Sequence, residues 1–426
     1  MPMLKEAAMR SPIDRQRLAG AALLACFTCC APGLAQASTG WGYVDLGAID
    51  GSFVGPVPAA MTALGIGQAF TAYGSTGSFS YSGSSIGDLG ALNGTSGGAY
   101  YVNAEGDVAG QSYSSTSAST QAFLYSGGKF TDIGSLGGSG TYVTGLNAAG
   151  EVIGYGNEAA NASTHAFAYS GGQIKDLGTL GGSTSSAVAV NNAGAVIGNS
   201  NTSGDAASHA FLYKVGTMTD LGTLGGKSSF ATAINAAGVV VGTSTLQGDT
   251  ARHAFEYTSS GMVDLGTLPG FNSSTAVAVN SAGQVIGNAT TAGSAATHAF
   301  LFANGKLTDL GTLGGTNSYA IGMDSFGDVI GLSDVVLADG STAQHSFLYG
   351  ISTNNKMTDL STIVPGVNFV AAGINDALQI IGTATTTTTN LVRGLIVSAV
   401  PEADGAALAL AGFAMLGWVA RTRRRG

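Results

Sequence analysis

The chain has 426 residues, of which 10% are charged, 45% are hydrophobic and 67 are glycines, and its formal net charge is −9. An average globular protein is about 25% charged and about 7% glycine, so this composition disfavours a typical cytosolic enzyme. A disordered chain combines low hydrophobicity with high charge, so the composition also disfavours a disordered linker. Glycine costs about 1 kcal/mol inside a helix and the recurring Val, Ile, Phe and Tyr favour strands, so we expect an all-β fold. Negative charge repels phosphate, which argues against a nucleic-acid partner.

Residues 1–37 have the pattern of a signal peptide that directs export. Three arginines precede an apolar run over residues 18–30, and the small-x-small sequence that ends in Ala35 and Ala37 follows. We therefore predict a helical signal that is cleaved after Ala37. A lipoprotein signal ending at Cys26 is the alternative. All three cysteines lie in this segment, so the mature chain would be stabilised by its core without a disulfide.

The sequence Asp-Leu-Gly, with two imperfect copies, recurs every 43 to 50 residues along the chain. Its copies begin at Asp45, Asp88, Asp132, Asp176, Asp220, Asp264, Asp309 and Asp359. We predict four short strands in each unit. The first is small and apolar, such as residues 186–190, the second contains Val-Ile-Gly, the third is His-Ala-Phe-x-Tyr, and the fourth ends in Asp-Leu-Gly. An Asn-x-x-Gly turn joins the first two strands, because Asn and Gly tolerate its backbone geometry.

Four strands about every 44 residues predict the blades of a β-propeller over residues 38–399. A linear solenoid is the competing interpretation, and the two ends of the array decide against it. Residues 41–47 supply a lone fourth strand, whereas residues 393–397 supply a third strand that no Asp-Leu-Gly follows. We therefore expect a monomeric eight-bladed propeller in which the N-terminal strand pairs with the C-terminal blade and hides both sheet edges. Seven blades are the alternative if residues 48–76 do not form three strands.

Residues 400–426 have the pattern of a sorting and membrane segment. Val400-Pro401-Glu402 precedes an apolar run over residues 405–420, and the basic residues Arg421, Arg423, Arg424 and Arg425 follow. Sixteen apolar residues are short for a spanning helix, which needs about 20, but flanking arginines extend it and favour a cytoplasmic end. We therefore predict a helical segment that anchors the chain transiently in the membrane.

The order of motif, apolar helix and basic tail resembles the PEP-CTERM sorting signal of Gram-negative bacteria, although Ala403 replaces the second proline of that motif. The resemblance implies an exosortase-type processing enzyme as a partner and a cell-surface or extracellular location. The repeated His-Ala-Phe-Leu-Tyr, Asp-Leu-Gly-Thr-Leu-Gly-Gly and Asn-x-x-Gly sequences resemble the HAF repeat of bacterial extracellular proteins over about residues 77–397. That resemblance implies export and a repeated fold, with no established activity.

All five histidines of the chain occupy one repeat position, which raises the question of a metal site. Zinc ligands lie within about 2.1 Å of one ion, whereas equivalent positions in neighbouring blades are separated by whole sheets about 10 Å apart. If Tyr213 pairs with Thr217 across a hairpin turn of residues 214–216, His209 on one strand lies beside Asp220 on the other. We therefore expect a structural hydrogen bond within each blade, from a donor at the start of the third strand to an acceptor at the end of the fourth, which satisfies polar groups buried between blades. We expect no metal or cofactor. The pairs are His165–Asp176, His209–Asp220, His253–Asp264, His298–Asp309 and His345–Asp359. Calcium binding by the aspartates stays open as an alternative, although D-x-D-x-D spacing is absent.

Residues that break the repeat are the candidates for catalysis, because eightfold copies cannot all be catalytic. The predicted propeller contains four glutamates, Glu105, Glu151, Glu158 and Glu256, and no pattern places two carboxylates about 5 to 9.5 Å apart as a glycosidase requires. The leading hypothesis is therefore an exported, non-catalytic structural or binding module of an extracellular polysaccharide matrix. Its variable loops, such as residues 200–208 and 246–252, would provide the binding face. The alternative is a carbohydrate-active enzyme, a glycoside hydrolase or lyase, on the same scaffold.

Overall fold

The computed structural model describes residues 34–36, 41–45, 57–61, 68–71, 78–82, 85–90, 96–114, 118–364, 366–386 and 392–399. The predicted signal helix and the predicted sorting segment, with Val400, Pro401, Glu402 and the arginines after residue 420, lie outside the described residues, apart from residues 34–36. Within these ranges, no helix has the length and apolar character needed to cross a membrane.

The described chain is built of antiparallel sheets whose strands follow one another in sequence. The first unit contains β3 (Val57–Met61), β4 (Gln68–Thr71), β5 (Ser78–Ser82) and β6 (Ser85–Gly90). The second contains β7 (Ser96–Val102), β8 (Val108–Ser114), β9 (Ser119–Ser126) and β10 (Lys129–Asp132). The third contains β11 (Gly137–Leu146), β12 (Val152–Glu158), β13 (Thr164–Ser170) and β14 (Gln173–Gly178). Next come β15 (Gly181–Val190), β16 (Val196–Thr202), β17 (Ser208–Lys214) and β18 (Thr217–Asp220); β19 (Gly225–Ile234), β20 (Val240–Leu246), β21 (Arg252–Thr258) and β22 (Gly261–Gly266).

The C-terminal half continues the same pattern. It contains β23 (Ser273–Val279), β24 (Val285–Thr290), β25 (Thr297–Ala303) and β26 (Lys306–Asp309); β27 (Ser318–Met323), β28 (Val329–Val336), β29 (Thr342–Tyr349) and β30 (Thr358–Asp359); and β31 (Val367–Ile374), β32 (Gln379–Thr386) and β33 (Val392–Ala399). Short 3-10 turns lie in the loops, namely η1 (Ala159–Asn161), η2 (Ser203–Asp205), η3 (Ala292–Ser294), η4 (Ile351–Thr353) and η5 (Leu360–Thr362).

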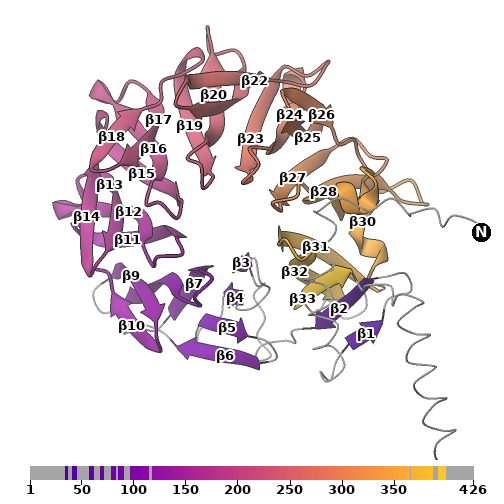
Figure 1. The fold of residues 1–426 in the computed structure, drawn as a ribbon, viewed down its shortest axis with the longest axis horizontal. Helices are drawn as coiled ribbons and strands as arrows, with labels where there is room; N and C mark the ends of the chain where they lie inside the picture. The colour runs from indigo at the N-terminus through magenta and orange to yellow at the C-terminus, as the bar shows by residue number, and fades with distance from the viewer. Residues whose placement is uncertain are drawn as a thin grey trace, which may run out of the picture.

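The sheets stand in a ring, and the first strand of each sheet, such as β19, β23 and β27, lies nearest the centre (Figure 1). Neighbouring sheets touch through single parallel bridges at Gly140↔Thr120 and Thr164↔Thr184. A ring of four-stranded antiparallel sheets is the β-propeller architecture. The all-β prediction and the propeller prediction are therefore confirmed.

The last sheet combines the two ends of the described chain. Strand β2 (Trp41–Asp45) pairs antiparallel with β33, with Trp41 opposite Ala399 and Asp45 opposite Leu395, and Trp41 packs against the buried cluster that contains Leu395. One strand was not expected: β1 (Leu34–Gln36) pairs with the outer edge of β2. An edge strand exposes unpaired N–H and C=O groups that another segment can satisfy. The predicted cleavage after Ala37 would remove β1, which contains Ala35, and leave β2 in the sheet.

The hydrophobic core lies between adjacent sheets rather than inside each one. Ile197, Ala210 and Leu221 of one unit form a cluster with Ala231, Val240 and Phe255 of the next. The phenylalanine of each His-Ala-Phe sequence is completely buried. Beneath one such ring, a Cβ added to Gly198 would lie 2.1 Å from the carbonyl oxygen of Ser186 and 2.6 Å from Phe211 Cζ. Glycine in Val-Ile-Gly therefore lets two strands and an aromatic ring approach closely.

The register of the outer hairpin differs by one residue from the alignment that the sequence suggested. Lys214, and not Tyr213, pairs with Thr217, and Phe211 pairs with Asp220. The connection is thus a two-residue turn, in which Val215 has a φ of 50°. A β-branched residue is rare in this left-handed region, so the shorter turn could not be recognised from the sequence.

Candidate functional site

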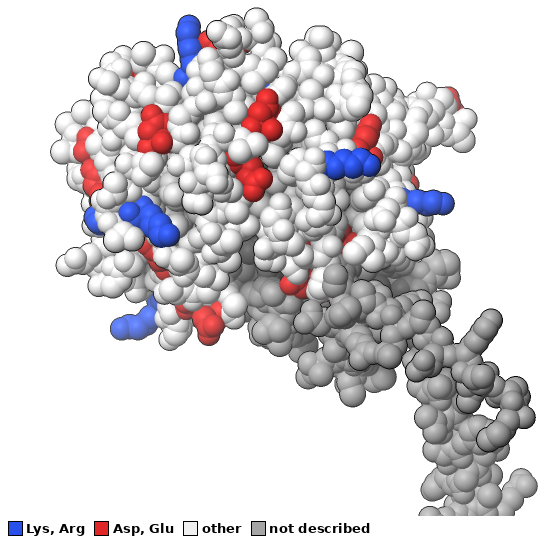
Figure 2. All heavy atoms as spheres, turned by 45° about the horizontal axis from the view of Figure 1, so that its top comes forward, with Lys and Arg blue, Asp and Glu red and all other residues white. Residues whose placement is uncertain are grey.

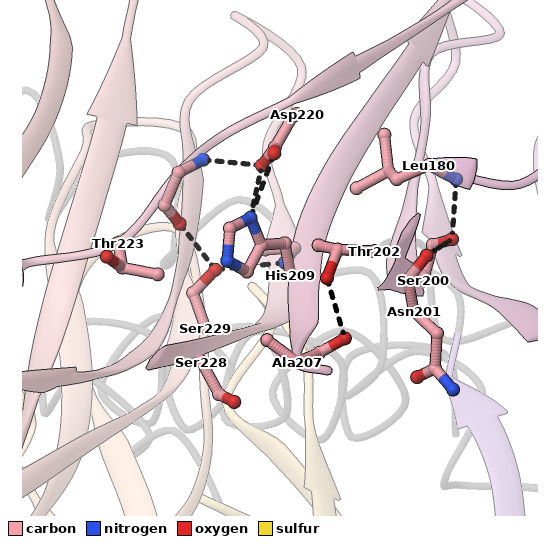
Figure 3. A network of polar contacts seen from close by, with 12 residues as sticks. Leu180, Ser200, Asn201, Thr202, Ala207, His209, Asp220, Thr223, Ser228 and Ser229 are labelled. Atoms are coloured by element: carbon pink, nitrogen blue, oxygen red, sulfur yellow. Dashed lines mark hydrogen bonds and ion pairs between the residues drawn. The ribbon is translucent and has the colours of Figure 1, made fainter. Parts of the chain in front are cut away.

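The repeated histidine and aspartate come together at the outer edge of the five sheets that contain a histidine. In the β15–β18 sheet, His209 Nδ1 lies 2.8 Å from Asp220 Oδ2, and the Gly222 N–H donates to Asp220 Oδ1 at 2.8 Å (Figure 3). The His209 side chain is 20% exposed and the Asp220 side chain 42%. His209 Nε2 faces the backbone carbonyl of Lys227 in the next sheet at 3.2 Å. The imidazole therefore connects its own sheet to the neighbouring one.

A buried serine of the next sheet completes this network. The Ala210 N–H donates to Ser229 Oγ at 3.0 Å, and the Ser229 hydroxyl donates to the Gly222 carbonyl at 2.6 Å (Figure 3). Ser229 is 0% exposed. Both backbone groups at the ends of β17 and β18 are thus satisfied by one side chain from β19, as buried polar groups require.

The same geometry repeats around the ring. The shortest distance from His Nδ1 to a carboxylate oxygen is 2.8 to 2.9 Å in all five pairs, which are His165–Asp176, His209–Asp220, His253–Asp264, His298–Asp309 and His345–Asp359. The serine bridge recurs at Ser185, Ser274 and Ser318. Each bond lies within one sheet and is partly exposed, because its residues end neighbouring strands, and the buried link between sheets is the serine.

A ladder of asparagines joins the turns between the first and second strands. Asn191 Oδ1 accepts hydrogen bonds from the Ala193 and Ala195 N–H groups, both at 3.0 Å, and its Nδ2 donates to the Asn235 carbonyl at 3.1 Å. Asn235 repeats the donation to Asn280, and Asn103 and Asn147 precede it in the ladder. These side chains are all at most 7% exposed. Sequence reasoning explained the asparagine by turn geometry and missed its contact with the next unit, although the 44-residue spacing carries that signal.

The ladder changes chemistry at Asp324, which stands where the other turns have asparagine. Asp324 Oδ1 still accepts from the Phe326 and Asp328 N–H groups, both at 2.9 Å. Asp324 is 3% exposed and Asp328 0% exposed. A carboxylate cannot donate as the asparagine amide does. This turn is instead joined to the following one by the Ser325 N–H, which donates to Asp376 Oδ1 at 2.9 Å.

One of the five His–Asp pairs has a second carboxylate beside the histidine. Glu158 Oε1 lies 3.3 Å from His165 Nδ1, which also lies 2.9 Å from Asp176 Oδ2. The three potential ligand atoms of Glu158, His165 and Asp176 lie within 4.8 Å of one another. Of the other off-repeat glutamates, Glu256 lies within β21 and Glu105 in the turn between β7 and β8.

Partly exposed aromatic side chains lie on the innermost strands of alternate units. Tyr142, Phe230 and Tyr319 occupy equivalent positions on β11, β19 and β27, five residues before the ladder position, and Phe230 is 40% exposed. Ser186 and Thr275 occupy this position in the intervening units. Tyr142 also stacks on Tyr155 with a centroid distance of 4.9 Å and an interplanar angle of 22°. This alternation was not predicted, although the fixed distance of these residues from the Asn-x-x-Gly turn reveals it in the sequence.

Charged groups on the described surface are few and scattered, and most of the face in Figure 2 consists of uncharged residues. Backbone N–H groups hold two loop carboxylates: the Ser183 N–H lowers the pKa of Asp205, and the Lys227 N–H lowers that of Asp249. Both acids lie in the variable loops that the sequence analysis named, and they fasten these loops to the start of the adjacent strand. Burial raises the pKa of Glu151, which follows an Asn-x-x-Gly turn.

No protein-family model matches the chain, and no curated protein matches its sequence. Among solved structures, the β-propeller domain of the Trilobed protease from Pyrococcus furiosus is similar at 8% identity and a TM-score of 0.44, covering 72% of this chain and 96% of that one. Porphyromonas gingivalis dipeptidyl peptidase 4 is similar at 11% identity and a TM-score of 0.48, and the match covers 76% of this chain and 56% of that one. Trypanosoma rangeli sialidase matches at 11% identity and a TM-score of 0.33, over 89% of this chain and 62% of that one. These similarities assign no activity to this chain.

Proposed function

We propose that this chain is an exported, non-catalytic propeller that binds extracellular polysaccharide as a structural module of the matrix. The proposed ring has eight blades and is closed by β2. Two observations support this number: β3 and β4 form within the degenerate segment of residues 48–76, and β2 takes the fourth place beside β31, β32 and β33. A propeller leaves only short, protected sheet edges on which another chain can pair, which supports a monomer.

The export and sorting steps follow from the two ends of the sequence. We propose cleavage after Ala37, transient anchoring by residues 400–426, and processing by an exosortase-type enzyme at Val400-Pro401-Glu402. The resemblance to HAF-repeat proteins and to the PEP-CTERM signal supports a cell-surface or extracellular location in a Gram-negative bacterium.

The observation that carries the binding proposal is the contrast between the repeated polar residues and the aromatic side chains. The His, Asp, Ser and Asn positions are used in bonds within and between sheets, as Ser229 and Asn191 exemplify. Tyr142, Phe230 and Tyr319 instead expose part of their rings on the innermost strands. Large flat rings offer apolar area, and tyrosine adds a polar tip, which suits the alternating C–H and hydroxyl surface of a sugar polymer.

The test is retention of the full-length protein on extracellular polysaccharide immobilised on beads. The triple variant Tyr142→Ser, Phe230→Ser, Tyr319→Ser copies the small residues of the intervening units. Aromatic contacts are worth about 0.5–1.5 kcal/mol each, so we expect the triple variant to lose at least about tenfold in affinity. Val263→Ala, on the outer strand β22, is the matched control at an exposed position.

Equal retention of the wild type and the triple variant would contradict the proposal, as would wild-type protein that binds no polymer. Release of reducing sugar by the wild-type protein would instead favour the carbohydrate-active enzyme. The same samples supply both readouts, because the beads and the supernatant are analysed separately.

A further inference from the structure

A second carboxylate joins the His–Asp pair in only one of the five units, and Glu158 supplies it. Glu158 is the last residue of β12, two positions beyond Gly156, which pairs with His165. The equivalent residues in the next three units are Thr202, Leu246 and Thr291. None of these side chains carries a charge, so the three-membered group depends on one departure from the repeat.

Three potential ligand atoms converge in this group, and the second oxygen of each carboxylate accepts a hydrogen bond from a neighbouring group. The Gly178 N–H donates to Asp176 Oδ1 at 2.7 Å, and the Ser163 hydroxyl donates to Glu158 Oε2. Asp176 Oδ2 and Glu158 Oε1 face His165 Nδ1 at 2.9 and 3.3 Å, and Asp176 Oδ1 lies 3.1 Å from the same nitrogen. The carboxylates are positioned by groups of their own loops, as outer-sphere partners position the ligands of a metal ion.

Hydrogen bonding alone leaves this group with an excess of negative charge. The single Nδ1 atom has at most one proton to donate, whereas two carboxylates face it. The neighbouring Lys175 extends over the Tyr213 ring, with its Nζ 5.4 Å from the ring centroid. No described Lys or Arg forms an ion pair with Glu158 or Asp176. A cation would therefore be attracted to this position.

The distances from His165 Nδ1 to the two carboxylate oxygens suit a small divalent ion. Zinc binds imidazole nitrogen and carboxylate oxygen at about 2.0–2.2 Å, so adjacent ligands lie about 3.0 Å apart in an octahedral site and about 3.4 Å apart in a tetrahedral one. The separations of 2.9 and 3.3 Å from His165 Nδ1 fall close to these values. Calcium and magnesium prefer ligand sets made of oxygen alone, whereas imidazole favours zinc and its neighbours in the first transition row.

We propose that Glu158 Oε1, His165 Nδ1 and Asp176 Oδ2 bind one divalent first-row transition ion, with Zn²⁺ as its representative. Binding requires the lone pair of Nδ1, so a neutral imidazole binds as the tautomer with its proton on Nε2, whereas an imidazolium releases one proton to solvent. Three protein ligands leave at least one coordination position for water or for an oxygen of another molecule. The side chains are 17% exposed for His165, 36% for Glu158 and 39% for Asp176, so this position is accessible from solvent.

The test uses the untagged full-length protein and Zn²⁺ alone, in competition with a chromophoric chelator. Glu158→Thr introduces the residue that the next unit has at position 202, so this variant is expected to fold, and Glu158→Gln keeps the side-chain shape without the charge. Even outer-sphere residues of metal sites contribute about ten- to a hundredfold in affinity, so we expect both variants to bind Zn²⁺ at least about tenfold more weakly. His209→Gln removes a repeat histidine that has no glutamate partner and is expected to bind Zn²⁺ as the wild type does.

Substitution of Co²⁺ for Zn²⁺ supplies a second readout. We expect the wild type and His209→Gln to give visible d–d absorption that both Glu158 variants lack. Equal Zn²⁺ affinity of the wild type and the Glu158 variants would overturn the proposal, and so would loss of binding in His209→Gln. Polysaccharide retention is measured separately, since the zinc proposal does not depend on it.

Discussion

Ser229→Ala is the sharpest test of how the sheets are held together. Ser229 is completely buried, and its hydroxyl accepts from the Ala210 N–H and donates to the Gly222 carbonyl of the preceding sheet. Alanine keeps the backbone and nearly the volume of the site, but leaves these two backbone groups buried without their partner. The substitution therefore isolates the bridge between sheets from the packing around it.

The magnitude follows from the cost of an unsatisfied buried group, which is about 1–3 kcal/mol. Two such groups predict a loss of about 2–6 kcal/mol in the free energy of unfolding. The adjacent Ser228 lies on the same strand but is only half-buried. Ser228→Ala is the matched control, and we expect it to change stability by less than about 0.5 kcal/mol, as surface substitutions usually do.

The assay is urea unfolding of the full-length protein, followed by tryptophan fluorescence and circular dichroism, with hydrogen exchange of the Ala210 amide as the local readout. We expect a lower urea midpoint and faster exchange of Ala210 in Ser229→Ala alone. If Ser229→Ala and Ser228→Ala unfold at the same urea concentration with equal Ala210 exchange, the serine bridge does not hold the sheets together.

Three further substitutions test other parts of the structure by urea unfolding. Gly198→Ala would place a Cβ 2.1 Å from a carbonyl oxygen of the neighbouring strand, so it should lower the free energy of unfolding by about 1–3 kcal/mol. Gly156→Ala is the control, because its nearest contact would be 3.4 Å and its stability should be nearly unchanged. Equal losses of stability in the two variants would refute the argument that Gly198 permits a close approach. Asp324→Asn restores the ladder amide and should add about 0.5–1.5 kcal/mol at neutral pH; a loss of stability would contradict the ladder. Burial raises the pKa of Glu151 above its value in the unfolded chain. The stability that protonated Glu151 contributes is therefore complete below the unfolded pKa and is lost as pH rises through the folded pKa. Glu151→Gln should remove this component from the dependence of stability on pH, and an unchanged dependence would refute the argument.

Much of the fold could be predicted from the sequence, because the repeat displays its period directly. The copies of Asp-Leu-Gly locate the ends of the fourth strands, and the Asn-x-x-Gly sequences locate the turns that begin at Asn191 and Asn235. The lone strand at Trp41 and the incomplete unit at the other end indicated their pairing, which is the pairing of β2 with β33. These features depend on local geometry and period, which one sequence is sufficient to reveal.

Other features depend on contacts between units, which periodicity alone does not reveal. Ser229 and Asn191 look like ordinary strand and turn residues until the next sheet is placed beside them. The position of Glu158 beside His165 depends on the course of the loop after β12. The 3-10 turn of this loop recurs as η2 and η3, so the side chain at position 158 is the departure from the repeat. The register error at Lys214 came from a turn in which Val215 adopts an uncommon backbone conformation.

The central claim is that the repeated residues build the ring and that the off-repeat side chains bind the ligand. The most direct measurement compares polysaccharide retention of two full-length triple variants, His209→Gln, His253→Gln, His298→Gln and Tyr142→Ser, Phe230→Ser, Tyr319→Ser, after circular dichroism has established that both are folded. The account predicts that the histidine variant is retained like the wild type and that the aromatic variant is lost from the polymer. Retention of the aromatic variant together with loss of the histidine variant would contradict it.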